Sequence, residues 1–404
     1  MPELKGIEYL RKKLASKRAR IELRYRYYEM KHMARDFGIS TPPEARWMMY
    51  AMGWCAKAVD ALSDRIVFDH FANDAYNLND IYNLNNKDVL IDSAVLGALI
   101  CSCSFIYITQ DEQGNPLMQD VDALNATGEI DPITNMLTES YAVLELDDNR
   151  IPKVEAYLLP YETQIFEHGK FVRSFRHPAP YPLLVPIIYR PDAKRPFGHS
   201  RISRTCMDLQ NIVARTVKRS EISAEFYSFP QRYVLGMDPE AEGIDKWKAI
   251  MSAMLRIDKD EDGDKPVVGQ FQQATQTPHL EQIRVIAGLF AGETGLTLDD
   301  LGFPSQNPSS SEAIKAAHEN LRLTARKAQR DFGVGFINAG YLAACLRDGQ
   351  AYKRNQLYNT TIKWAPIFEP DISSLSGVGD AVQKIATSFP DYFTEEKLNE
   401  LTGI

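Results

Sequence analysis

Apolar residues recur at spacings of three and four along several stretches of this chain, which is the pattern of helices that bury one face. The narrowest pattern predicts a long helix over residues 201–229, which Pro230 ends. Its apolar positions form one seam with charged residues beside it, so we expect packing against one or two neighbours rather than burial on all sides. The seam consists of Ile202, Cys206, Leu209, Val213 and Val217.

Four further stretches predict helices. Pro43 suits the first turn of a helix that runs to Leu62. Trp47 and Met48 would lie on the apolar stripe of that helix. The other three helices are predicted over residues 78–99, over residues 277–292 and from Glu312 onward.

Short β-prone runs separated by turn residues extend from Cys103 to about residue 190 and predict a small antiparallel β subdomain. A compact insertion over residues 231–276 adds strand-like runs around a short predicted helix. A last strand is predicted near residues 359–364, before a short helical C-terminal piece. Helices and antiparallel strands in separate stretches place the chain in the α+β class.

A long irregular segment, from Thr294 to Ser309, separates two of the predicted helices. Loops beyond about 12–15 residues inside a compact protein are usually functional or disordered. The segment leads into a capping box over residues 309–312, which predicts a sharp helix start. This loop is therefore a candidate functional element.

Charge is unevenly distributed, and the N-terminal stretch is basic. Residues 3–36 hold eleven basic and five acidic residues, and neither Pro nor Gly occurs between Ile7 and Phe37. We therefore expect one long basic helix there. It is either an arm that binds nucleic acid or, as its interleaved acidic residues favour, a solvated or subunit-facing helix that docks on the acidic remainder.

The whole chain of 404 residues is acidic, with a formal charge of −8. That charge argues against a protein that coats nucleic acid by neutralising phosphates. The five cysteines form no CxxC pair, so reduced and partly buried thiols are expected. Because the chain has no apolar run of bilayer length and no signal peptide, we expect a soluble, intracellularly made protein without membrane contact.

No catalytic, cofactor or metal site is predicted. The chain lacks the phosphate-binding loop, the dinucleotide fingerprint, the HExxH motif and the GxSxG motif. Asp258, Asp260 and Asp262 match the first ligands of an EF-hand loop, but Gly269 stands where the last ligand, a glutamate, belongs. An acidic turn is expected there, with a weak cation site as the alternative.

The order of six segments resembles the portal proteins of tailed bacteriophages, which are ring-shaped head–tail connectors. The most specific segment contains Thr294-Gly-Leu296, Leu301-Gly302 and then residues 307–314. It is similar to the run that precedes a long helix in that family. The other five segments are residues 58–65, 96–106, 185–190, 197–229 and 230–236.

The resemblance implies a portal-type subunit with a mixed wing, two stem helices, a small α/β clip and a reduced crown. The implied parts are a wing over residues 1–200, a stem helix over 201–229, a clip over 230–276, a second stem helix over 277–292, a tunnel loop over 293–311, a wing helix and strand over 312–370, and the helical C-terminal region or reduced crown over 371–404.

The resemblance also implies a non-enzymatic homo-oligomeric ring, a dodecamer, assembled in the host cytoplasm and located at one capsid vertex of the virion. Such a ring is a channel for the packaging and ejection of double-stranded DNA. It also docks terminase, a head–tail adaptor and the capsid or scaffolding protein. The alternative is another capsid-associated structural protein, or a nucleic-acid-processing enzyme whose site uses scattered acidic residues.

Within that implied fold, two sets of residues are candidates for the channel. The DNA-channel candidates are Arg215, Lys218, Arg219, Gln306 and Asn307, and the tunnel-loop candidates are Leu298, Asp299, Asp300 and Phe303. The alternative role of the three basic residues is ion pairing between subunits with Glu221 or Glu225. The alternative role of Gln306 and Asn307 is turn formation and helix capping.

Overall fold

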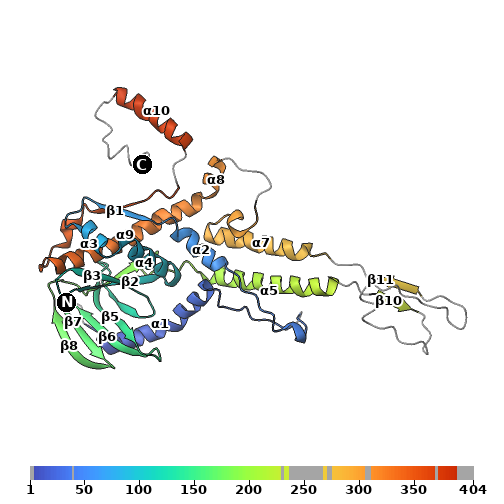
Figure 1. Cartoon of the computed structure of the whole chain (residues 1–404), viewed down its shortest axis with the longest axis horizontal. Coiled ribbons are helices and arrows are strands. Elements are labelled where there is room, and N and C mark those ends of the chain that lie inside the picture. The colour runs from blue at the N-terminus through green and yellow to red at the C-terminus, as the bar shows by residue number, and fades with distance from the viewer. Residues whose placement is uncertain are drawn as a thin grey trace, which may run out of the picture.

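The computed structural model describes a mixed α+β protein, as the sequence predicts. Figure 1 shows a broad body of helices and antiparallel strands, from which two long helices, α5 and α7, project side by side. The described residues are 4–38, 41–228, 232–235, 267–270, 275–304, 311–368 and 372–388.

Helices make up the projecting pair and much of the body (Figure 1). Those of the described residues are α1 (Ile7–Tyr28), α2 (Trp54–Ser63), α3 (Leu78–Leu84), α4 (Lys87–Cys101), α5 (Arg204–Ser228), α7 (Thr277–Thr294), α8 (Ser311–Ala317), α9 (Glu319–Arg347) and α10 (Ile372–Ser388), with 3-10 turns η1 (Pro43–Ala45), η2 (Asp299–Leu301) and η3 (Arg354–Leu357).

The strands of the described residues pair antiparallel in four sheets, which confirms the predicted antiparallel β subdomain. Two sheets have two strands each, β1–β12 and β10–β11, a third has the order β3-β2-β9, and the fourth is a five-stranded meander from β4 to β8. The strands are β1 (Phe68–Ala72), β2 (Cys103–Gln110), β3 (Pro116–Val121), β4 (Ala126–Ile130), β5 (Leu137–Leu146), β6 (Pro152–Leu159), β7 (Glu162–Glu167), β8 (Lys170–Arg176), β9 (Leu184–Ile188), β10 (Arg232–Leu235), β11 (Val267–Gln270) and β12 (Thr361–Trp364).

The main hydrophobic core lies where α9 packs on β2 and β9. Phe332 and Phe336 of α9 are fully buried there. Gly335 faces β9 so closely that a Cβ atom would lie 2.6 Å from Ile187 Cδ1 and 3.0 Å from the Pro186 carbonyl oxygen. The absence of a side chain at Gly335 therefore allows α9 to pack closely against β9.

The N-terminal half of α1 docks on the five-stranded sheet through charge as well as apolar contact. The carboxylate of Glu139, which is 1% exposed, accepts hydrogen bonds from the backbone N–H groups of Lys5 (2.8 Å) and Gly6 (3.1 Å). The Arg11 guanidinium donates to Glu155 at 3.0 and 2.7 Å. The predicted docking of this helix on acidic residues is thus observed within one chain, on its own sheet.

The prediction of one helix from Pro43 to Leu62 is wrong. Only a 3-10 turn forms at Pro43–Ala45, and α2 begins at Trp54. The segment between them follows α5 instead: the Arg46 carbonyl accepts a hydrogen bond from Lys218 (3.4 Å), and Trp47 is 79% exposed. Contacts with a helix far away in the sequence therefore override the local helical pattern.

The predicted helix over residues 78–99 is divided into α3 and α4 by Asn85 and Asn86. The Asn85 side-chain amide donates to the carbonyls of Ile81 (2.8 Å) and Pro116 (3.0 Å), and its oxygen accepts from the Met118 N–H (2.8 Å). An asparagine that bonds backbone groups in this way favours a turn over a continued helix. The basic N-terminal helix also ends earlier than predicted, at Tyr28.

All five cysteines are buried and unpaired, as their spacing predicts. Across the described parts of the chain, no helix combines the length and apolarity needed to cross a bilayer.

Candidate functional site

The α5–α7 pair is the most distinctive feature of the molecule (Figure 1). The two helices run antiparallel, since Ser203 bonds Glu293 (2.8 Å) near the body and Ser220 bonds Gln276 (3.0 Å) towards the far end. The predicted helices over residues 201–229 and 277–292 are both confirmed as helices. Because each polar pair joins the two helices directly, they form one antiparallel unit.

The base of this unit is held by a buried arginine. Arg201 is 8% exposed, its Nε donates to the Ala58 carbonyl (3.2 Å), and its Nη2 donates to the Thr294 carbonyl. One guanidinium thus joins the start of α5, the end of α7 and the helix α2. The sequence offers no signal for this role, because its partners are backbone groups far away along the chain.

The inner side of the pair is apolar, and α7 also has an apolar outer side. Cys206 and Val213 of the predicted α5 seam are buried, which confirms the seam. On α7, Val285 is 65% exposed and Leu289 is 59% exposed. Gly288 has open space where a Cβ would stand. Val285, Gly288 and Leu289 thus form an exposed apolar face of α7 that no described residue covers. Another chain can pack on such a surface.

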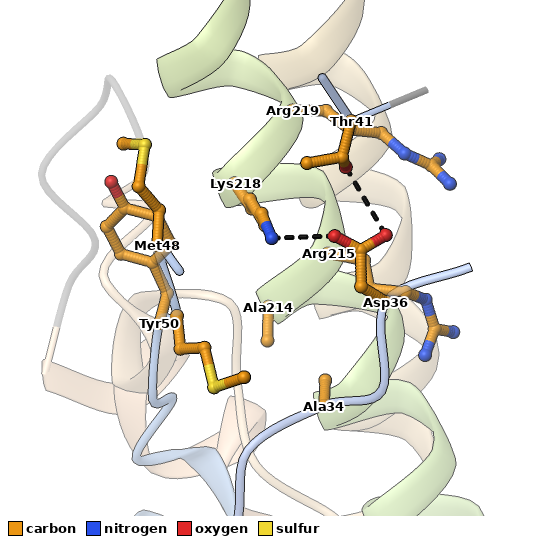
Figure 2. A pocket seen from close by; sticks show the side chains of 10 residues that line it. Ala34, Asp36, Thr41, Met48, Tyr50, Ala214, Arg215, Lys218 and Arg219 are labelled. Carbon is orange, nitrogen blue, oxygen red and sulfur yellow. Dashed lines mark hydrogen bonds and ion pairs between the residues drawn. The ribbon is translucent and has the colours of Figure 1, made fainter. Parts of the chain in front are cut away.

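Lys218 of α5 lies in a pocket lined by residues 34, 36, 41 and 48–50 of the segment before α2. Its side chain is 9% exposed, and its ammonium donates to Asp36 (2.6 Å). Figure 2 shows this contact and the Thr41 hydroxyl that bonds the same carboxylate. The Lys218 charge is therefore neutralised inside its own chain, by a residue that the sequence analysis did not single out and that lies 182 positions away.

Asp36 is held as a carboxylate by this pocket. The hydrogen bond from Lys218, with those from the Gly38 N–H and the Thr41 hydroxyl, lowers the pKa of Asp36 to about 2. The folded protein consequently keeps this ion pair charged down to strongly acidic conditions.

Arg215 and Arg219 differ from Lys218, because no carboxylate of the described residues lies within ion-pair distance of either. Both are half-buried, and Figure 2 shows their guanidinium groups extending to the same side of α5. The Arg215 guanidinium stacks 4.6 Å from the ring centroid of Phe37. Burial, together with the charge of Arg219, lowers the pKa of Arg215 from its ordinary value.

The segment after α7 is more ordered than an irregular loop. Thr294 still belongs to α7, Gly295 ends the helix in the left-handed conformation, and η2 follows. Leu298 and Phe303, two of the predicted tunnel-loop residues, pack against the main core. Residues 295–304 are irregular as predicted apart from η2, and their apolar side chains pack against the body.

The two acidic tunnel-loop candidates differ in environment. Asp299 is exposed, whereas Asp300 accepts hydrogen bonds from the Thr297 N–H and hydroxyl (both 2.9 Å) and lies 3.3 Å from His318 Nε2. Burial alone would raise the pKa of Asp300, but the bonds from Thr297 and the nearby His318 lower it. His318 stands between α8 and α9, so the single helix predicted from Glu312 is interrupted where Asp300 contacts it.

Several predicted positions lie outside the described residues. They are Gln306 and Asn307, the first residues of the capping box, the EF-hand-like aspartates Asp258, Asp260 and Asp262, and residues 389–404. Within the described ranges, no group of three or more His, Cys, Asp or Glu side chains is arranged to hold a metal ion.

The comparisons with known proteins agree with one another. The family described as "Phage portal protein, SPP1 Gp6-like" matches residues 7–374. The chain is 25% identical over 382 residues to the portal protein of Mycobacterium phage L5, covering 89% of this chain and 77% of that one. It is also 25% identical over 381 residues to the portal protein of Mycobacterium phage D29, which again covers 89% of this chain and 77% of that one.

Among solved structures, a chain from the virion of a native gene transfer agent particle aligns with a TM-score of 0.47 and 13% identity. That alignment covers 87% of this chain and 89% of the other.

Proposed function

This chain belongs to the SPP1 Gp6-like family of phage portal proteins, and on that premise we propose that twelve copies close into a ring that conducts double-stranded DNA. A portal protein is a structural component of the virion. In our proposal the ring occupies one capsid vertex, and DNA passes through its axial channel during packaging and ejection. The observation that carries the proposal is the α5–α7 pair. This pair projects from the body (Figure 1), and α7 has exposed apolar residues.

Ring closure would use that exposed face of α7. A closed ring needs a heterologous interface, in which one face of each subunit packs on a different face of the next. Val285 and Leu289 offer apolar area for such a contact, and Gly288 and Gly292 leave room for close approach by a neighbouring helix. We therefore assign α7 to the contact between adjacent stem regions.

The parts of the subunit then follow the portal plan. The body would be the wing, α5 and α7 the two stem helices, and β10 with β11 the strands of the clip. The proposed ranges are wing 1–200, stem 201–229, clip 230–276, stem 277–292, tunnel loop 293–311, returning wing 312–370 and reduced crown 371–404.

The charge of the chain suits a conduit. DNA that must slide cannot be held by many phosphate contacts, because each contact adds affinity through counterion release. A chain of net charge −8 with few unneutralised cations on its stem satisfies that requirement. Arg215 and Arg219 have no carboxylate partner among the described residues and are our channel candidates. The buried Lys218 instead holds Asp36 and the Arg46 carbonyl on α5.

The loop residues take a more limited part in this proposal. Leu298 and Phe303 are packed against the core, and Asp300 is occupied by Thr297 and His318. Contact with DNA is therefore assigned to the neutral polar residues Gln306 and Asn307. As in other portals, terminase, a head–tail adaptor and the capsid or scaffolding protein would dock on the assembled ring.

The assembly is tested by measuring the mass of the purified full chain. Twelve copies of a 45.7 kDa chain give a particle of about 550 kDa. The double variant Val285→Asp/Leu289→Asp should lose this particle, because two carboxylates would be buried in the contact without partners.

The control is Ile133→Asp, which places one carboxylate at an 89% exposed apolar residue between β4 and β5. This control should assemble normally. A particle that survives the α7 double variant unchanged would show that this face is not the subunit contact.

A further inference from the structure

A pocket separate from the α5–α7 pair lies beside the C-terminal half of α1. Its volume is about 230 Å³, and its walls come from α1, the junction of α4 with β2, the start of β4 and the loop over residues 195–199. No residue of α5 or α7 lines it. A ligand in this pocket would therefore be held by the body of the subunit.

The pocket is lined by cations and by no carboxylate. Lys17, Arg20 and Arg24 are spaced three and four apart, which places them on one face of α1. Arg195 and His199 face them from the loop. Five basic side chains thus converge on one small volume.

The basic residues in and just before α1 differ in how their charge is balanced. Lys5 and Lys13 pair with Glu129, and Arg11 pairs with Glu155. The three cations of α1 that line the pocket have no such partner: none of them lies within 4 Å of a carboxylate in the described parts of the chain.

Two acidic groups beside the pocket already have partners. Asp122 accepts a hydrogen bond from the Tyr25 hydroxyl. Asp192 lies 2.5 Å from Nε2 of the lining residue His199. Burial, together with the charge of neighbouring cations, lowers the pKa of both Lys17 and Arg24 from their ordinary values.

Two polar groups of the lining also lack partners. Thr127 is 1% exposed, and its hydroxyl makes no hydrogen bond within the described residues. The Nε of Arg24 is likewise buried and unpartnered there, while its Nη1 reaches only the Cys101 carbonyl, at 3.5 Å. Buried donors are normally satisfied, so their presence beside a cationic cavity indicates a missing acceptor.

The loop that completes the pocket is fixed in place before any ligand arrives. Gly198 has a φ of +72°, and a Cβ there would collide with the Tyr189 carbonyl oxygen. The His199 N–H donates to that same oxygen (2.9 Å), and the Arg195 N–H donates to the Asp192 carboxylate (2.7 Å). Groups held in this way lose little freedom on binding, which favours affinity.

We propose that this pocket binds a phosphate-type oxyanion, with Lys17, Arg20, Arg24 and Arg195 as charged donors and the Thr127 hydroxyl as a neutral one. Planar guanidinium groups match the geometry of phosphate oxygens and bind them in pairs. The oxyanion is either a free phosphate or polyphosphate ion or a phosphate of a nucleic-acid backbone, since both present the same chemistry. This site is additional to the proposed channel and does not depend on it.

The test is calorimetric titration of the assembled full chain with tripolyphosphate at constant ionic strength. We expect saturable binding of one ion per chain. Arg24→Gln and, separately, Lys17→Gln should each weaken it about tenfold, the effect of losing one charge-assisted hydrogen bond. Lys12→Gln, at an exposed lysine of the same helix outside the pocket, is the matched control and should bind normally.

A second arm identifies the source of the oxyanion. If a short DNA duplex displaces tripolyphosphate from the parent chain, the ligand is a backbone phosphate, and if it does not, the ligand is a free ion. The mass of each variant assembly is measured in parallel, so that loss of the ring is distinguished from loss of the site. An absence of saturable binding by the parent chain, or binding by the Arg24→Gln and Lys17→Gln variants as tight as that of the parent chain, would overturn the proposal.

Discussion

The ion pair between Asp36 and Lys218 should contribute measurably to stability, because it joins the segment before α2 to α5 through a buried ammonium group. Lys218 Nζ lies 2.6 Å from Asp36 Oδ2. The Asp36 side chain is 27% exposed and the Lys218 side chain is 9% exposed. In Asp36→Asn the Lys218 ammonium would stay buried without a negatively charged partner. Its other acceptor is the Arg46 carbonyl oxygen, 3.4 Å away. The substitution therefore leaves a buried charge almost unpaired.

The magnitude follows from how exposed the two partners are. Breaking a fully buried pair from one side costs about 3–5 kcal/mol, and an exposed pair contributes about 0–1 kcal/mol. Since Asp36 keeps partial contact with water, we expect Asp36→Asn to lower the free energy of unfolding by about 2 kcal/mol. Lys218→Met should cost about 1 kcal/mol, because Asp36 retains the Gly38 N–H and the Thr41 hydroxyl.

The assay is a double-mutant cycle by urea denaturation at one protein concentration. The double variant should lose less stability than the two single losses combined, by about 1 kcal/mol. Asp208→Asn is the matched control on α5, because its pair with Arg204 spans 3.8 Å between side chains that are 65% and 91% exposed. It should change stability by less than about 0.5 kcal/mol.

The same pair predicts a dependence on pH. The pKa of Asp36 is lowered from 3.8 to about 2 in the folded chain, so its contribution is complete above pH 3.8 and is lost as the pH falls towards 2. The difference in stability between the parent chain and Asp36→Asn should shrink over that interval. Additive single losses, or a difference that stays constant down to pH 2, would show that Asp36 and Lys218 do not form a stabilising ion pair in solution.

Three further predictions follow from other parts of the chain. Gly335→Ala should lower the melting temperature by several degrees, because the new Cβ would lie 2.6 Å from Ile187 Cδ1; an unchanged melting temperature would contradict the close packing. Glu139→Gln should cost about 1–3 kcal/mol and speed hydrogen exchange at the start of α1, and unaltered exchange would rule out its role as an anchor. Gln306→Ala with Asn307→Ala should leave the ring mass unchanged but reduce DNA packaging in infected cells, whereas full packaging would exclude these residues from the channel.

The sequence predicts those features of the fold that depend on local periodicity. The seam from Ile202 to Val213 identifies α5 because a buried helical face repeats every three to four residues whatever it packs against. The antiparallel strands after Cys103 are similarly marked by their turn residues.

Long-range contacts account for what the sequence could not predict. Residues 46–53 carry a helical pattern, yet they lie along α5, where the Arg46 carbonyl meets Lys218. Arg201 gives no sign in the sequence that it is buried among backbone carbonyls. The basic residues of α1 cannot be told apart by their positions in the sequence. In the fold, Arg11 forms an ion pair with Glu155, whereas Arg24 forms none with any carboxylate in the described parts of the chain.

The central claim is that copies of this chain form a closed ring whose axial channel is surrounded by α5 and α7. Electron cryo-microscopy of the purified full-length assembly tests it most directly. Our account predicts a closed ring of twelve subunits, with the α5–α7 pairs packed side by side around the channel and α7 of each subunit contacting its neighbour. A monomer under all conditions, or a ring in which the α5–α7 pairs point away from the axis, would contradict it.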